Sequence, residues 1–122
     1  MKLRKYYRGK DKLSKLGFDG DFNTIKIRSP KEDPLHLILK ATISKILEER
    51  KRNWATEIKI GNAIIDVVDL DEELGYEVQK IITEKWKKQI LKYPIDVIPI
   101  KLDEYKALNT CEIYSKLSKH VV

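Results

Sequence analysis

The sequence predicts an α/β fold in which one helix precedes three strands and a second helix connects the third strand to a fourth. Three observations lead to this order. Apolar residues repeat at helical spacing after Asp33 and again after Thr83. Between them, short segments rich in β-branched residues are separated by turn residues. The expected core, residues 33–102, is a mixed four-stranded sheet flanked by helices, with extra helices at the C-terminus.

The first helix is expected to begin at Asp33-Pro34, because aspartate is a favourable N-cap and proline suits the first helical position. Basic residues at 50–52 favour the negative pole of the helix dipole and mark its end. Residues 1–30 form a basic N-terminal arm in this scheme, with a short strand at Thr24–Arg28. The apolar face of the helix is formed by Leu35, Leu39, Ile43, Ile46 and Leu47.

Three strands are predicted next, at Trp54–Ile60, Ala63–Leu70 and Gly75–Lys80. Gly61-Asn62 is a typical hairpin turn between the first two. The acidic segment 71–73 then makes an exposed connection to the third. These three strands are therefore expected to form an antiparallel meander.

Thr83 is the expected N-cap of the second helix, and Pro94 ends it. Its apolar face is expected to carry Ile82, Trp86, Ile90 and Tyr93. The fourth strand, 95–102, contains Pro99, which favours an edge position. The connection between the third and fourth strands should be a right-handed crossover. Terminal helices are predicted at Asp103–Leu108 and Cys111–His120.

Composition predicts one domain of 122 residues with a net charge of +6. The charge is uneven, because residues 1–60 hold 16 basic and 8 acidic residues, whereas the remainder holds 9 and 11. No apolar run resembles a secretory signal or a membrane span, which predicts a cytoplasmic protein without a membrane partner. The single cysteine, Cys111, has no partner for an internal disulfide and is interpreted as a packing residue.

Asp66 is the most informative residue, because it lies among four apolar neighbours in a predicted strand. A buried carboxylate there is costly unless it is paired or bound to metal. On the next strand, Glu77 and Gln79 share one face, while Tyr76 and Val78 share the other. Asp66 and Glu77 are therefore expected to face each other, and such a carboxylate pair can bind Mg²⁺.

Other polar residues extend this site in one interpretation and are structural in another. His36 and Lys40 continue the buried stripe of the first helix, where they could contact a phosphate. Alternatively, the Lys40 stem lies on the core with its ammonium in water. Glu57 could be a further site carboxylate, or it could face solvent and pair with Lys59.

The helix and strand order, with Asp66 on the second strand and Glu77-Val78-Gln79 on the third, resembles the PD-(D/E)xK, or restriction-endonuclease-like, superfamily. With His36, Lys40 and Glu57, the pattern is more narrowly similar to the branch typified by the competence protein CoiA, and to small archaeal or viral nucleases. The resemblance covers residues 33–102 and implies a restriction-endonuclease-like fold, Mg²⁺ or Mn²⁺ as cofactor, and cleavage of DNA phosphodiester bonds.

The resemblance implies that Asp66 and Glu77 bind the metal and that Gln79 replaces the usual lysine. A neutral amide cannot supply that positive charge, which makes Lys40 the candidate to supply it from the helix. The catalytic set is then Asp66, Glu77, Gln79, Lys40, His36 and Glu57.

DNA is the expected partner, and its backbone is expected to contact six basic residues: Lys2, Arg4, Lys5, Arg8, Lys85 and Lys88. A chain of this size that cuts both strands of a duplex could act as a homodimer, in the host cytoplasm if it is viral. Two alternatives remain open. One is a DNA-binding or assembly module that kept the fold and lost catalysis, and the other is an RNA-processing nuclease.

Overall fold

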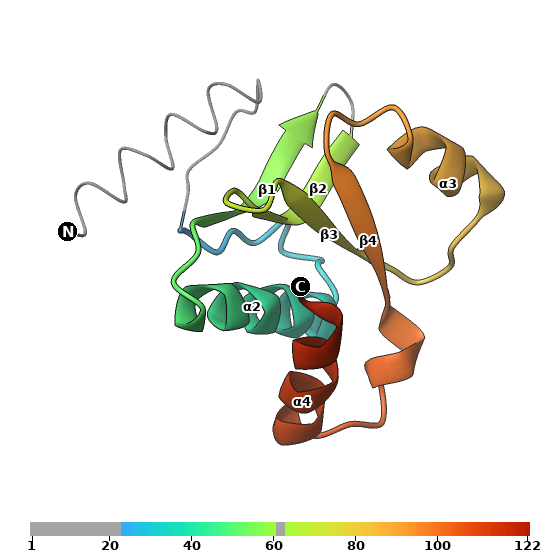
Figure 1. Ribbon diagram of the computed structural model, residues 1–122. Coiled ribbons are helices and arrows are strands. Elements are labelled where there is room, and N and C mark those ends of the chain that lie inside the picture. The colour runs from blue at the N-terminus through green and yellow to red at the C-terminus, as the bar shows by residue number, and fades with distance from the viewer. Residues whose placement is uncertain (1–22, 61–62) are drawn as a thin grey trace.

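A computed structural model describes residues 23–60 and 63–122, whose helices and strands follow the predicted order (Figure 1). A 3₁₀ helix, η1, at Leu102–Tyr105 connects the last strand to the last α-helix. The other elements are α2 (Pro34–Glu49), β1 (Trp54–Ile60), β2 (Ala63–Asp69), β3 (Leu74–Gln79), α3 (Glu84–Ile90), β4 (Asp96–Lys101) and α4 (Thr110–His120). None of the helices in the described residues is long and apolar enough to cross a membrane.

The four strands form one mixed sheet in the order β1-β2-β3-β4. The first three pair antiparallel and β4 pairs parallel with β3. The coarse fold class is therefore confirmed. Pro99 lies on β4, an edge strand as predicted, where its missing N–H costs no bond to a further strand.

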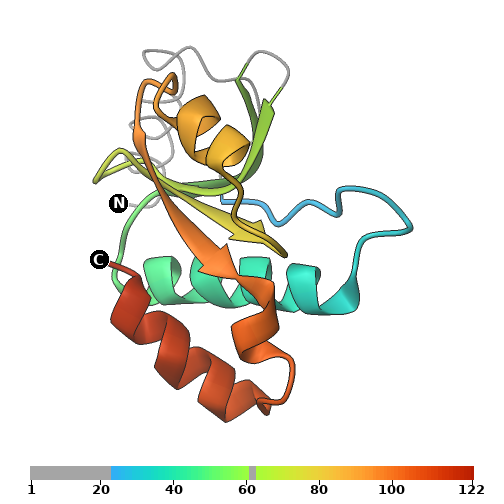
Figure 2. The ribbon, with the colours of Figure 1, turned by 90° about the vertical axis from the view of Figure 1, so that its right-hand side faces the viewer.

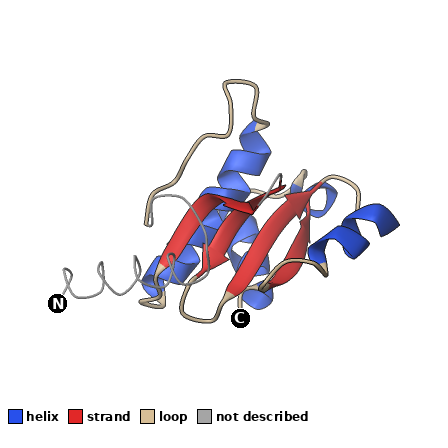
Figure 3. Ribbon diagram, turned by 90° about the horizontal axis from the view of Figure 1, so that it is seen from above, coloured by secondary structure: helices blue, strands red, loops and turns tan. Residues whose placement is uncertain are grey.

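Helices α2 and α4 lie on one side of the sheet and α3 lies on the other (Figures 1 and 2). Seen from above, the strands lie side by side across α2 (Figure 3). Asp33 caps α2 by accepting the Leu35 N–H at 2.8 Å, as the sequence predicted. Asn109 and Glu112 form a reciprocal capping box at the start of α4. These caps fix the positions at which the two helices begin.

The main core fills the space between the sheet and these two helices. Leu39, Ile43 and Leu47 of α2 are fully buried there, as their helical spacing predicted. They pack with Tyr76 and Val78 of β3. A smaller apolar cluster lies on the opposite face of the sheet and contains Ala55, Ile58, Ile65, Val68, Leu70 and Ile95. Both faces of the central strands are therefore buried, which is what makes a carboxylate in β2 costly.

Replacing Gly75 by valine is expected to destabilise the protein by about 1–3 kcal/mol through overpacking. A Cβ at this position would lie 3.1 Å from Ile65 Cγ2 and 3.3 Å from Val97 Cγ2. Urea denaturation measures the loss, and Gly75→Ala should cost less than Gly75→Val. If the valine variant were as stable as the wild type, the β propensity of valine would outweigh the crowding.

The structure differs from three of the expectations. The predicted strand at Thr24–Arg28 does not form, because Lys26 N–H donates to the Thr56 hydroxyl at 2.9 Å instead of to a β1 carbonyl. The expected helix at Asp103–Leu108 is the shorter η1. Cys111 is exposed, so its interpretation as a packing residue was wrong. The predicted turn at Gly61-Asn62 lies outside the described residues, as does most of the N-terminal arm.

The alternation of side chains breaks at one level of the sheet. Ile65 and Val67 are two residues apart yet belong to opposite core clusters, and Ala55 and Ile58 are three apart yet share one. Glu57 has a φ of 52°, in the left-handed region, at the same level. Because of this irregularity, Glu57 and Asp66 both point toward α2. With regular alternation, Asp66 would point away from the face that its neighbour Val67 occupies.

Candidate active site

Six charged side chains meet between the irregular part of the sheet and the N-terminal half of α2. Glu57 of β1 and Asp66 of β2 come from the sheet, and His36 and Lys40 come from the helix. Arg28 and Glu32 join them from the segment before α2. Acidic and basic groups alternate, so each of the three carboxylates contacts two of the three cations.

Lys40 lies at the centre of this cluster and is fully buried. Its ammonium donates to Glu57 Oε1 at 2.8 Å and to Glu32 Oε2 at 3.0 Å. The alternative in which this ammonium reaches water is therefore wrong. The buried ammonium holds both carboxylates in position. Without it, each of these buried groups would lose a charged partner.

Asp66 is also fully buried, and its carboxylate lies where β2 and β3 separate. The strand pairs end at Val67 opposite Tyr76, and Asp66 Oδ2 accepts the Val78 N–H beyond them at 2.6 Å. Asp66 Oδ1 accepts from the Arg28 guanidinium. The Asp66 carboxylate therefore takes the place of a β2 backbone carbonyl as the acceptor for the Val78 N–H of β3.

Glu57 joins the site because of its backbone. A left-handed conformation is uncommon for a non-glycine residue and costs about 1–3 kcal/mol. Its carboxylate accepts from Lys40 and, at 3.1 Å, from Arg28 Nε. These contacts favour the interpretation of Glu57 as a site residue over pairing with Lys59.

His36 lies between two carboxylates. Its Nδ1 is 2.7 Å from Glu32 Oε2 and its Nε2 is 3.3 Å from Asp66 Oδ1. Because ionised carboxylates only accept hydrogen bonds, a doubly protonated ring suits this position, although Nε2 lies at an ion-pair distance from Asp66 without the geometry of a hydrogen bond. The contact with Asp66 accordingly raises the pKa of His36, against the opposing effect of burial. Burial alone would raise the pKa of Glu32, but the Arg28 N–H, His36 and Lys40 lower it.

Glu77 approaches the site from the other side of β3. Its Oε2 accepts the indole N–H of Trp86, on α3, at 2.9 Å. Burial and, to a smaller extent, the negative charge of Asp66 raise the pKa of Glu77 to about 7, against the lowering effect of the hydrogen bond from Trp86. The expectation that Asp66 and Glu77 face each other was therefore wrong: Asp66 contacts His36 of α2, Glu77 contacts Trp86 of α3, and the two carboxylates interact only electrostatically. Tyr76 and Val78 lie in the main core, as the predicted alternation requires.

Replacing Glu77 by glutamine is expected to remove one component of the pH dependence of stability. The folded pKa of about 7 exceeds the ordinary 4.5, so the native state binds more protons between these values. Stability therefore falls as pH rises from 4.5 to 7, by on the order of 1–3 kcal/mol, and stays lower above pH 7. Urea denaturation at pH 5 and pH 8 in a chelator should show a larger loss for the wild type than for Glu77→Gln. Parallel losses would contradict a buried, uncompensated Glu77.

The remaining predicted residues lie farther from the centre. Gln79 is partly buried at the end of β3 and, among the described residues, has no side-chain hydrogen bond to the cluster. Lys85 and Lys88 are exposed on α3. The proposed DNA contacts Lys2, Arg4, Lys5 and Arg8 lie outside the described residues.

The sequence interpretation missed Arg28 and Glu32. Glu32 precedes His36 by four residues and Lys40 by eight, so extending the helical stripe by one turn would have found it. Arg28 has no comparable local signal, because only the path of the chain before α2 brings it to Asp66.

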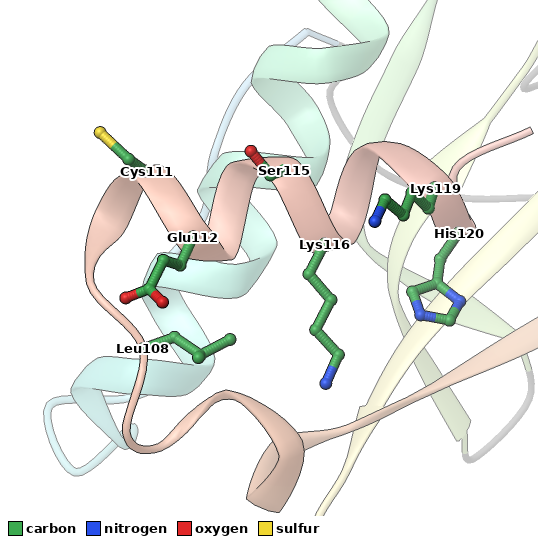
Figure 4. Close-up of a pocket in the computed structure, with 7 residues that line it drawn as sticks. All are labelled: Leu108, Cys111, Glu112, Ser115, Lys116, Lys119 and His120. Atoms are coloured by element: carbon green, nitrogen blue, oxygen red, sulfur yellow. The ribbon is translucent and has the colours of Figure 1, made fainter.

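A cavity of about 350 Å³ opens beside the cluster. Arg28, Glu32 and His36 line it together with Val78 of β3, and Lys31 and Lys80 are exposed at its margin. A larger hollow of about 610 Å³ lies along α4 (Figure 4). There Cys111 and Ser115 point away from Glu112 and Lys116, so the polar groups do not converge. We therefore place the candidate active site at the smaller cavity.

No protein-family model, curated protein or solved structure matches the chain significantly. The functional interpretation consequently rests on the geometry of the cluster and its cavity.

Proposed function

We propose that the chain is a metal-dependent endonuclease that hydrolyses phosphodiester bonds of DNA, with a restriction-endonuclease-like core. The observation that carries this proposal is the buried carboxylate of Asp66, placed where β2 and β3 separate, close enough to Glu77 to influence its pKa and beside a cavity with a basic margin. A structural carboxylate needs neither a second acid nor a cavity, whereas an enzyme acting on phosphate needs both acids and cations.

The donor chemistry fits Mg²⁺ or Mn²⁺. Asp66 and Glu77 supply hard carboxylate oxygens, and burial raises the pKa of Glu77 although Arg28 and His36 partly offset its charge. Asp66 would hold the ion, and Glu77 would join it once its side chain leaves the Trp86 indole. When bound, the ion would lower the pKa of a water and neutralise charge on the phosphate. No ready-made cluster of three or more acidic, histidine or cysteine ligands occurs in the described residues, so waters and substrate would complete the coordination.

The other residues then have distinct tasks. His36 and Arg28 line the cavity, where a cationic imidazole and a guanidinium can bind phosphate oxygens. Lys40 is a positioning residue, because its ammonium is occupied by Glu32 and Glu57. Gln79 is left to orient a water or phosphate through its amide. The cationic role first considered for Lys40 thus passes to His36 and Arg28 in this proposal.

DNA fits the distribution of charge around the cavity. Lys31 and Lys80 are exposed at its margin, and α3, which carries no buried residue, presents Lys85, Lys87 and Lys88. Lysines on an exposed helix suit contacts with a phosphate backbone, which add affinity without sequence specificity. Both groups of lysines would therefore add to the affinity for a polyanion.

The test is incubation of supercoiled plasmid and a four-way DNA junction with Mg²⁺ or Mn²⁺, with EDTA as the metal-free control. The wild type should nick or cut at least one substrate in a metal-dependent manner, and Asp66→Ala should not. A duplex RNA tested in parallel decides against the RNA-processing alternative if it is spared. Equal cleavage by both proteins would contradict the assignment.

One observation favours a second candidate, a DNA-binding or assembly module without catalysis. Asp66 and Glu57 are already paired with Arg28, His36 and Lys40, as in a purely structural network. Salt-dependent DNA binding without cleavage under any divalent metal would select this candidate.

A further inference from the structure

Arg28 bridges the two sheet carboxylates of the site. Its guanidinium donates through Nη2 to Asp66 Oδ1 and through Nε to Glu57 Oε2. Burial alone would lower the pKa of Arg28, but Asp66 and Glu57 raise it, so the pairing with both is electrostatically favourable. A cation already occupies Asp66, the residue to which the proposed function assigns a metal ion.

Arg28 is the most exposed of the three cations in the cluster. Its side chain is 40% exposed, compared with 12% for His36 and 0% for Lys40. His36 and Lys40 belong to α2 and cannot leave without disturbing the core. Arg28 belongs to a segment without regular secondary structure, and its side chain also lines the cavity.

The backbone is anchored before Arg28 and at Arg28 itself, so the side chain can move alone. Before it, Lys26 N–H donates to the Thr56 hydroxyl, which donates to the Thr24 carbonyl. At Arg28 itself, the backbone N–H donates to Glu32 Oε1 at 2.6 Å. Rotation of the side chain into the cavity breaks none of these bonds.

The charges of the cluster balance only while Arg28 is present. Glu32, Glu57 and Asp66 carry three negative charges, against Arg28, Lys40 and a protonated His36. Removal of the guanidinium leaves one excess negative charge, or two with a neutral histidine, before Glu77 is counted. A divalent cation compensates that excess.

We propose that Arg28 is an internal counter-ion that a divalent metal ion must displace from Asp66 and Glu57 in order to bind. This inference rests on the proposed function. It means that the protein binds metal more weakly than its carboxylates alone would, and that the released guanidinium lies in the cavity, where a substrate phosphate can hold it. Metal and substrate phosphate should then favour the same conformation, in which the Arg28 guanidinium lies in the cavity.

The experiment measures Mn²⁺ binding to the full chain after EDTA treatment and dialysis, by the electron paramagnetic resonance signal of free Mn²⁺. Arg28→Met removes the charge while keeping an extended apolar stem. Arg28→Lys keeps the charge without the two-pronged contact. Lys45→Met is the matched control, because Lys45 is an exposed lysine of α2. Asp66→Asn reports whether the metal bound is the one at this site.

The dissociation constant for Mn²⁺ should fall at least about tenfold in Arg28→Met, equivalent to about 1.4 kcal/mol, and severalfold in Arg28→Lys. Lys45→Met should change it less than about twofold, and Asp66→Asn should abolish binding. If Arg28→Met fails to fold, Arg28→Lys decides by the same criterion. Unchanged or weaker binding in the Arg28 variants, with binding still dependent on Asp66, would overturn this inference alone. Absence of Asp66-dependent binding in every variant would overturn the metal site and this inference together.

Discussion

Replacing Lys40 by methionine is expected to lower the free energy of unfolding by about 3 kcal/mol. The methionine can occupy the space of the fully buried stem but leaves Glu32 and Glu57 without the ammonium that contacts both. Those carboxylates are themselves only 4% and 9% exposed, so water cannot replace the lost partner. His36 and Arg28 remain in contact with them and limit the loss.

Urea denaturation at pH 7 measures this effect. Lys45→Met, on the exposed side of the same helix, should change stability by less than about 0.5 kcal/mol. Adding Glu57→Gln to Lys40→Met should restore part of the stability, giving a coupling energy of about 1–3 kcal/mol in the double-mutant cycle. The defect should shrink toward pH 5, because a stranded carboxylate can take up a proton. A stability loss no larger than that of Lys45→Met would show that the ammonium reaches water.

The helices and strands were predictable because each has a local signal. Asp33-Pro34 and Thr83 begin α2 and α3 in the structure, and both side chains accept the expected backbone hydrogen bonds. Pro99 placed β4 at an edge. The prediction of a strand at Thr24–Arg28 was wrong because extended residues form a strand only when they pair with residues far away in the sequence. Its bond to the Thr56 side chain leaves no local pattern in the sequence.

The site was predictable where periodicity applies. His36 and Lys40 were expected on one stripe of α2, and both join the cluster. Asp66 was predictable as a site residue because a carboxylate among apolar residues needs a partner. In the structure it is fully buried. The placement of Glu57 depends on a left-handed backbone, which no residue type at that position signals. That irregularity, and the path of the chain that brings Arg28 to Asp66, are properties of the assembled sheet.

The largest effect on function is expected from Asp66→Asn, which should reduce metal-dependent DNA cleavage about a thousandfold, equivalent to roughly 4 kcal/mol of transition-state stabilisation. Asparagine preserves the volume, and its carbonyl oxygen can still accept the Val78 N–H. What it removes is the negative charge that would bind the metal and that now contacts Arg28 and His36. The loss should therefore exceed any effect on folding.

The matched control is Asp96→Asn, an exposed carboxylate at the start of β4. Asp96 pairs in register with Leu74, three positions from the pair that contains Glu77, so its charge should not reach the cavity. Rates on the plasmid and the junction should match the wild type for Asp96→Asn. Binding of the same DNA, measured with calcium in place of magnesium and at several salt concentrations, should persist in both variants, because lysines and not Asp66 contact the backbone. Cleavage by Asp66→Asn at the wild-type rate would exclude the proposed active site. DNA binding retained by all three proteins without cleavage by any would identify the cluster as a structural network that holds α2 against the sheet.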